Sequence, residues 1–266
     1  MEPDARSIPL WPGQPPESKP EEDFRPSLDL YPVETRGPRG AVVICPGGGY
    51  CGRAPHEGAG YAARFNAAGL HAFVVQYRVS PHRHPAPLLD AARAVRIVRD
   101  RAGEWNVRPD RVAVCGSSAG GHVAASLAVH SGDPAVNTGG RLDAVGARPD
   151  ALILCYPVIT TGEFAHRGSI DNLLGPDASD GMLRKMSLEL HVTEKTPPTF
   201  LWHTANDPGV PVENSLLFAA ALSRHHVPFE LHVYPDGAHG IGLAEDNAHV
   251  ATWAELCGDW FAAMGF

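Results

Sequence analysis

Residues 116–120 combine glycine and serine in a spacing that suits nucleophilic catalysis. The pentapeptide Gly-Ser-Ser-Ala-Gly has the pattern G-x-S-x-G, and it stands between the apolar run 111–115 and the small-residue segment 121–130. A strand that turns sharply into a helix holds its nucleophile in a strained conformation, and glycines two positions away on either side let the backbone pass that closely. The pattern therefore predicts Ser118 as the nucleophile, because Ser117 stands at the wrong offset from the two glycines.

A second glycine-rich stretch could supply the amide donors that such a nucleophile needs. Residues 46–50 read Pro-Gly-Gly-Gly-Tyr and follow an apolar run, at the place where lipases and esterases carry an HGGG-type loop. We expect two amides of this loop to face a ligand, with the N–H of Ala119 beside the serine oxygen. A flexible turn is the plain alternative. A phosphate loop is disfavoured, since no Gly-Lys-Ser/Thr follows.

An acid and a base follow in the chain order Ser, Asp, His. Asp207 comes directly after the apolar run 199–205, and His239 comes after the run 229–235 in a loop with flanking glycines. Because each follows a predicted strand, we expect both to lie at the carboxyl edge of one sheet, near Ser118. This order predicts a Ser118–His239–Asp207 triad.

Rival groups stand close to both partners in the sequence. Asp207 could be a plain turn residue, and Asp236 is a second candidate acid. His203 lies inside a predicted strand and His249 begins a predicted helix, so both are less free to reach the serine than a loop histidine. His239 therefore remains the preferred base.

The elements that must position these residues alternate along the chain. Short runs rich in β-branched residues are expected as strands at 41–46, 72–78, 111–115, 151–157, 199–205 and 229–235. Helical spacing of apolar residues marks 88–102, 214–225 and 249–264. The alternation predicts an α/β fold, with a mostly parallel twisted sheet flanked by helices.

The domain organisation follows from the remaining segments. Residues 28–266 are expected to form one catalytic domain, preceded by an extended, proline-rich arm over 1–27 that forms no regular element. The interval 159–198, after the strand 151–157, is too long for a simple connection. We expect it to be a small insertion with short helices near the top of the sheet, where substrate-contacting elements are common.

Composition narrows the classes of partner. The net charge of −8 and the lack of a Lys/Arg-rich block argue against nucleic acid and acidic membranes and favour a neutral small-molecule substrate. Neither a signal-peptide pattern nor a membrane-span pattern is present, and the five cysteines are scattered, so a cytoplasmic protein is expected. Histidine clusters at 82–84 and 225–226 lack metal-ligand spacing, and we expect no metal. The pattern carries no signal for the oligomeric state.

The ordered motifs resemble those of one known family across nearly the whole chain. The chain is similar to the single-domain α/β-hydrolase esterases of the acetyl xylan esterase and acetyl esterase type, which are related to dienelactone hydrolases. The matching blocks are IPLWPG (8–13), PGGGY with HEG (46–58), YRVSP (77–81), DAARAVRIVR (90–99), GSSAGGHVAASLA (116–128), YPVIT (156–160), HRGSIDNLLG (166–175), TPPTFLWHTANDPGVPVENS (196–215) and HVYPDGAHG (232–240).

The resemblance implies the α/β-hydrolase fold, with the insertion after its strand 6, and a set of site residues. It gives the roles of nucleophile, acid and base to Ser118, Asp207 and His239, and it implies Gly48, Gly49 and Ala119 as oxyanion donors. Tyr50, Glu57 and His166 lie in family-like blocks and are candidates for lining the substrate site. Pro46 stands where the lipase-type loop has histidine, a feature that the family shares.

The implied reaction is hydrolysis of short acyl esters without a cofactor. Acetylated xylo-oligosaccharides or other acetylated sugars are the expected substrates, and a serine rather than a cysteine at position 118 speaks against the dienelactone hydrolase branch. A general short-chain carboxylesterase remains an alternative. A serine peptidase of the oligopeptidase type is disfavoured, because residues 1–27 are too few to form the N-terminal propeller domain of such enzymes. A catalytically inactive binding protein is also disfavoured, because the predicted triad is intact.

Overall fold

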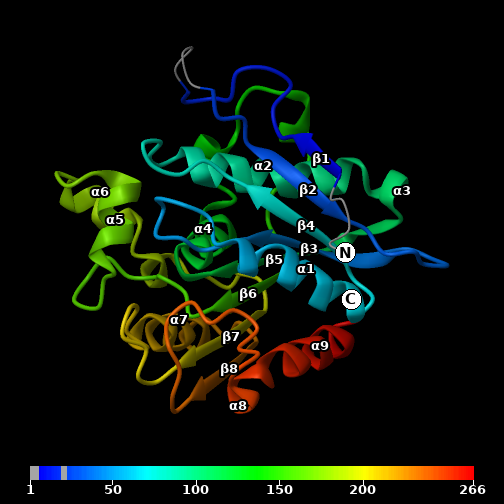
Figure 1. Ribbon diagram of the computed structural model, residues 1–266. Helices are drawn as coiled ribbons and strands as arrows, with labels where there is room; N and C mark the ends of the chain where they lie inside the picture. Colours follow the sequence, from blue (N-terminus) through cyan, green and yellow to red (C-terminus); the bar gives the residue numbers. More distant parts are fainter. Residues whose placement is uncertain (1–5, 19–22) are drawn as a thin grey trace.

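The computed structural model describes residues 6–18 and 23–266, which build one twisted sheet with helices on both faces (Figure 1). Within the described residues the sheet has eight strands in the order β1-β2-β4-β3-β5-β6-β7-β8. All pairings from β4 to β8 are parallel, whereas β1 and β2 add antiparallel strands at one edge. The predicted α/β-hydrolase fold with a mostly parallel sheet is confirmed.

The strands are Arg6–Pro9 (β1), Ser27–Tyr31 (β2), Arg39–Cys45 (β3), His71–Gln76 (β4), Val107–Ser117 (β5), Ala151–Cys155 (β6), Thr199–Thr204 (β7) and Phe229–Tyr234 (β8). The helices are Ala59–Ala67 (α1), Ala86–Asp100 (α2), Ala102–Trp105 (α3), Ser118–His130 (α4), Arg167–Leu174 (α5), Asp180–Lys185 (α6), Glu213–Arg224 (α7), Ala248–Ala251 (α8) and Trp253–Ala263 (α9). Four 3-10 turns are Pro55–Glu57 (η1), Pro134–Val136 (η2), Arg141–Ala144 (η3) and Leu188–His191 (η4).

The central strands are apolar along their whole length because helices cover both faces. In β3, Val43 packs into the core that contains α2, α4 and α7, whereas its neighbours Val42 and Ile44 pack into the core that contains α1 and α9. This alternation explains why these strands read as continuous hydrophobic runs. Each run ends at the same edge of the sheet, which is where the candidate residues stand.

The sequence reading missed several elements. The arm was expected to form no element, but Arg6–Pro9 is strand β1, and β2 begins at Ser27 inside that range. Helix α1 was not anticipated, and the pattern over 249–264 is interrupted into α8 and α9. Residues 1–5 and 19–22 of the arm lie outside the described residues. The predicted short helices of the interval 159–198 are confirmed as α5, α6 and η4.

A buried ion pair attaches the arm to the domain. Arg78 and Asp90 are both fully buried, and two guanidinium nitrogens of Arg78 bind the Asp90 carboxylate at 2.8 Å. Trp11 donates its indole N–H to the same carboxylate at 2.8 Å, and Arg78 also donates to the Ser18 hydroxyl and the Pro16 carbonyl oxygen. The arm thus supplies partners that two buried charges require.

Replacing Asp90 by asparagine should destabilise the protein strongly. The guanidinium of Arg78 would stay buried without its counter-ion, which costs about 3–5 kcal/mol in comparable cases. Urea unfolding of Asp90→Asn measures this loss. Asp100→Asn on the same helix is the matched control, because Asp100 pairs with the exposed Arg141 at the surface and its loss should change stability little. Equal stability of the two variants would contradict the assignment.

Among residues 6–18 and 23–266, no helix is both long enough and apolar enough to cross a membrane.

Candidate active site

The sequence 116–120 forms a sharp strand-to-helix turn. Strand β5 ends at Ser117 and α4 begins at Ser118, whose φ of +51° is a strained value for a residue with a side chain. A Cβ atom on Gly116 would meet the carbonyl oxygen of Gly120, and one on Gly120 would meet that of Cys45. Only glycines fit at these two positions, so the local sequence is required by the turn.

Three side chains from separate loops meet at this turn. The Oγ of Ser118 lies 2.8 Å from Nε2 of His239, and Nδ1 of the same ring lies 2.8 Å from Oδ2 of Asp207. Asp207 follows β7 and His239 follows β8, and because β5 to β8 are parallel, both residues lie at the edge of the sheet where β5 ends. A Cβ on Gly209 would stand 2.9 Å from Cγ of His239, so this glycine lets the imidazole approach.

The Asp207 carboxylate is buried and held by several donors. Its Oδ1 accepts the backbone N–H groups of Gly209 and Val210 at 2.8 and 2.9 Å, and its Oδ2 lies 3.4 Å from Nε2 of His203. Burial raises the pKa of Asp207, but the hydrogen bonds from His203, His239 and the two amides outweigh it and hold the pKa well below its usual range. The carboxylate is therefore ionised and fixes the orientation of His239.

The rival groups lie in other surroundings. His203 is fully buried, with its nitrogens against Ser215 Oγ and the Val210 carbonyl oxygen. Asp236 is exposed and accepts the side-chain amide of Asn206 at 2.8 Å. His249 is exposed on α8, with its ring against that of Tyr234. The structure brings together Ser118, His239 and Asp207, and the described contacts of these rivals do not include the serine hydroxyl.

The glycine loop 46–50 lies beside the turn. Gly48 and Gly49 have φ values of +127° and +63°, which glycine adopts without strain. The N–H of Gly47 donates to Oε2 of Glu57 at 2.6 Å, so this amide is occupied. Asn172 of α5 donates its side-chain amide to the Gly49 carbonyl oxygen at 2.8 Å. Ala119 follows Ser118 in the first turn of α4, whose N-terminus points at the serine.

Two of the candidate substrate-lining residues are buried behind the site. Tyr50 is 2% exposed, and its hydroxyl lies 2.8 Å from Nδ1 of His122 on α4. Glu57 is also 2% exposed, and both of its oxygens accept hydrogen bonds from within the protein. These side chains belong to the packing that supports the loop, and their expected contact with substrate stays a prediction. A sequence block shows the residue type but not which way the side chain points.

His166 occupies a different position. It caps the N-terminus of α5, is half-buried, and its Nδ1 lies 2.8 Å from the Ser169 hydroxyl. Burial lowers the pKa of His166, the neighbouring His239 lowers it further, and Asp207 partly offsets these effects. The imidazole therefore lies within the electrostatic reach of His239 and Asp207, at the end of the insertion.

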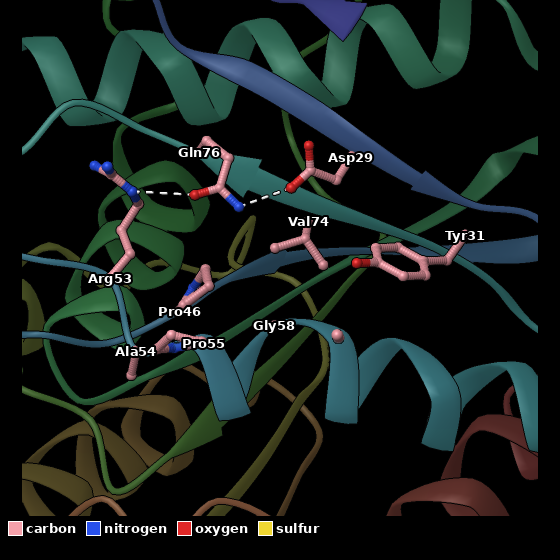
Figure 2. Close-up of a pocket in the computed structure, with 10 residues that line it drawn as sticks. Asp29, Tyr31, Pro46, Arg53, Ala54, Pro55, Gly58, Val74 and Gln76 are labelled. Atoms are coloured by element: carbon pink, nitrogen blue, oxygen red, sulfur yellow. Dashed lines mark hydrogen bonds between the residues drawn. The ribbon is translucent and has the colours of Figure 1, made fainter. Parts of the chain in front are cut away.

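A cleft of about 310 Å³ borders the start of the glycine loop (Figure 2). Its walls come from β2, β4, the loop and the segment 54–59, with Arg53 donating to Gln76 at 3.1 Å and Gln76 to Asp29 at 2.8 Å. Pro46, the first residue of the loop, lines this cleft, whereas Ser118 is not among its lining residues. Within the described ranges, no group of three or more His, Cys, Asp or Glu residues is arranged to hold a metal ion.

Sequence reasoning missed Tyr156, His122 and Asn172. Tyr156 lies directly after β6, where its hydroxyl donates to Glu57 and its ring packs edge-on against His239 with centroids 5.3 Å apart. The block YPVIT that contains Tyr156 was noted for its resemblance alone. Its position at the end of a parallel strand is the signal that could have placed it beside the triad.

Comparison with known proteins identifies relatives that share most of this chain. The BD-FAE family model matches residues 28–222. Endo-1,4-beta-xylanase B of Butyrivibrio fibrisolvens is 42% identical over 228 residues, and acetylxylan esterase of Xylanibacter ruminicola is 33% identical over 230 residues. Each match covers 84% of this chain, but the chain spans only 36% and 45% of the lengths of these two relatives.

A solved structure matches the whole chain. The acetyl ester-xyloside bifunctional hydrolase from Caldicellulosiruptor lactoaceticus has 46% sequence identity and a TM-score of 0.95, with 100% of this chain and 98% of that chain covered. The similarity includes the arm, which the family model leaves out. From the family match and these relatives, the chain belongs to the BD-FAE family of α/β-hydrolase esterases.

Proposed function

We propose that this protein is a serine esterase that hydrolyses short acyl esters, acetyl esters of xylo-oligosaccharides above all. The observation that carries the proposal is the pair of 2.8 Å contacts joining Ser118 Oγ, His239 and Asp207 at a strained turn. A hydroxyl, an imidazole and an ionised carboxylate in this sequence are the parts of a nucleophile with its base. The acetylated sugar is inferred from the names of the relatives.

The mechanism begins with proton transfer from Ser118 Oγ to Nε2 of His239 as the oxygen attacks the ester carbonyl. The Asp207 carboxylate accepts the Nδ1–H and favours the charged imidazolium. In the next step His239 gives the proton to the leaving alcohol, and an acyl–Ser118 ester remains. Water, deprotonated by His239, then attacks this ester, releases the acid and restores the serine hydroxyl.

The negative oxygen of both tetrahedral intermediates needs preorganised donors. The amides of Ala119, Gly48 and Gly49 are proposed for this role, because Ala119 stands in the first turn of α4 and the Gly47 amide is already bonded to Glu57. The Asn172 bond to the Gly49 carbonyl oxygen connects the insertion to the same loop. His166 at the other end of α5 is the proposed contact to the alcohol half of the substrate.

The substrate class is tested by comparing acyl chains and alcohols. We expect p-nitrophenyl acetate to be hydrolysed faster than the butyrate or octanoate, and acetate to be released efficiently from acetylated xylo-oligosaccharides. His166→Ala should raise KM for the oligosaccharide more than for p-nitrophenyl acetate. If p-nitrophenyl butyrate or octanoate were hydrolysed faster and no acetate were released from the oligosaccharides, the acetylated-sugar assignment would be wrong. The protein would then be a general carboxylesterase.

A further inference from the structure

Glu57 is a buried carboxylate that the reaction as described does not use. It ends η1, between the glycine loop and α1, and its side chain is 2% exposed. Its Oε2 accepts the Gly47 N–H at 2.6 Å and its Oε1 accepts the Tyr156 hydroxyl at 2.6 Å. A buried carboxylate is costly unless such donors compensate it, and both donors here come from segments that border Ser118.

Glu57 is the end point of a directed chain of hydrogen bonds. Because Tyr156 gives its hydroxyl proton to Glu57, its oxygen accepts the Gly242 N–H at 3.0 Å and the Tyr61 hydroxyl at 3.3 Å. The Ser117 hydroxyl in turn donates to Tyr61 at 3.2 Å. The glycine loop, the residue before the nucleophile and the loop that carries His239 are thus all oriented by one anion.

The same chain reaches the imidazole of His239. Tyr156 packs edge-on against this ring, at an interplanar angle of 73°, and holds a φ of +37° that is strained for tyrosine. His56, which precedes Glu57, has its Nε2 2.8 Å from the carbonyl oxygen of Gly240, the residue after His239. The turn η1 therefore contacts the histidine loop directly through His56 and indirectly through Tyr156.

The charges around the imidazole are few. Burial raises the pKa of Glu57, whereas the hydrogen bonds from Tyr156 and Gly47 and the nearby His56 and His239 lower it, and the net shift is upward. The titratable groups that face His239 from the packed elements are Asp207, Glu57, His166, His56 and Tyr156, with His203 behind Asp207. Asp207 and Glu57 are the carboxylates in this set.

The glycine loop is held closely on the side of Glu57 and Ser118. Figure 2 shows Pro46, the first residue of the loop, beside Pro55 and Gly58 along the cleft. A Cβ on Gly47 would stand 2.7 Å from Oε2 of Glu57 and 3.0 Å from Cβ of Ser118. Gly47 therefore packs closely between the Glu57 carboxylate and the Ser118 side chain. A shift of Glu57 would move the loop.

We propose that Glu57 is a positioning residue of the esterase, which fixes the glycine loop through Gly47 and His239 through Tyr156. The inference rests on the proposed function, because the positioned groups are those that carry out ester hydrolysis there. It assigns to the HEG motif a role in the site.

The test compares Glu57→Gln with the wild type on p-nitrophenyl acetate. Glutamine keeps the shape of the side chain but removes its charge. Its amide N–H would face the donor group of either Gly47 or Tyr156, so one of the two hydrogen bonds would be lost. We expect kcat to fall about 10- to 100-fold with KM changed less than about threefold.

Two further variants serve as comparisons. One breaks the hydrogen-bond chain at Tyr156, and the other makes a carboxylate-to-amide change elsewhere in the protein. Tyr156→Phe removes the hydrogen bond from the tyrosine hydroxyl to Glu57 but leaves the bond from Gly47 in place, so kcat should fall about tenfold. Asp100→Asn makes the same carboxylate-to-amide change at the surface pair with Arg141, and its kcat/KM should equal that of the wild type. If Glu57→Gln does not fold, the Tyr156→Phe result decides.

The outcomes that overturn the proposal are specific. A Glu57→Gln enzyme with wild-type kcat overturns it, and so does a loss of kcat/KM that comes from KM alone. An unchanged kcat in Tyr156→Phe overturns the positioning of His239. If the wild-type protein and Ser118→Ala hydrolysed the ester equally, the proposed function would be refuted. That comparison involves no variant at position 57, so it is independent of the Glu57 proposal.

Discussion

Replacing Ser118 by alanine is expected to lower kcat/KM for p-nitrophenyl acetate by at least about 10⁴-fold. Without the Oγ, no acyl-enzyme forms, and the remaining amides can only assist direct attack by water. The imidazole of His239 would lose its 2.8 Å partner but keep the bond to Asp207, so the fold should be retained. Initial rates of the purified variant, at the lowest detectable background, measure the effect.

Ser117 provides the matched control for this prediction. It is buried beside the nucleophile, and its hydroxyl donates to Tyr61 rather than to His239. Ser117→Ala should therefore lose less than about tenfold in kcat/KM, as expected for one hydrogen bond in a supporting chain. A larger loss in Ser117→Ala than in Ser118→Ala would contradict the assignment of the nucleophile.

The second large effect is expected for Asp207→Asn, with kcat lower by about 10³- to 10⁴-fold. The amide would keep the shape of the carboxylate, but it could turn an N–H toward Nδ1 of His239. That contact favours the tautomer with its proton on Nε2, which cannot accept the proton of Ser118. The change would also remove the negative charge that stabilises the imidazolium. The kcat of this variant measures the effect.

Asp236 separates the two candidate acids in a single experiment. It is exposed and bonded to Asn206, and Asp207 instead accepts two backbone amides and lies against His239. Asp236→Asn should keep most of the wild-type kcat. If Asp236→Asn were the more damaging substitution, the histidine would have to be oriented by a different group from the one described.

Much of the framework could be predicted because parallel strands have a simple geometry. Apolar runs such as 151–157 and 199–205 are strands whose carboxyl ends meet at one edge, so residues that follow them come together. Ser118, Asp207 and His239 were predicted on this basis, and the structure brings their side chains within hydrogen-bonding distance. Their catalytic roles stay predictions that the substitutions above test.

The remaining features depend on contacts that local patterns do not contain. Strand β1 in the arm forms only because β2 pairs with it and because Trp11 reaches Asp90, 79 positions away. The hydrogen bonds of Glu57 to Gly47 and Tyr156 could not be predicted, because a motif gives no side-chain direction. Its partner Tyr156 is 99 positions distant, so the buried hydrogen-bond chain could be found only after the strands were assembled.

The most direct test of the account is peptide mapping of the wild-type protein after reaction with an organophosphonate ester. Such a reagent phosphonylates an activated serine and then stops, because the adduct is not hydrolysed. The account predicts one adduct per chain, on the peptide that contains Ser118, formed in step with the loss of p-nitrophenyl acetate hydrolysis and lacking in Ser118→Ala. An adduct on another residue, or hydrolysis that persists after complete labelling, would contradict it.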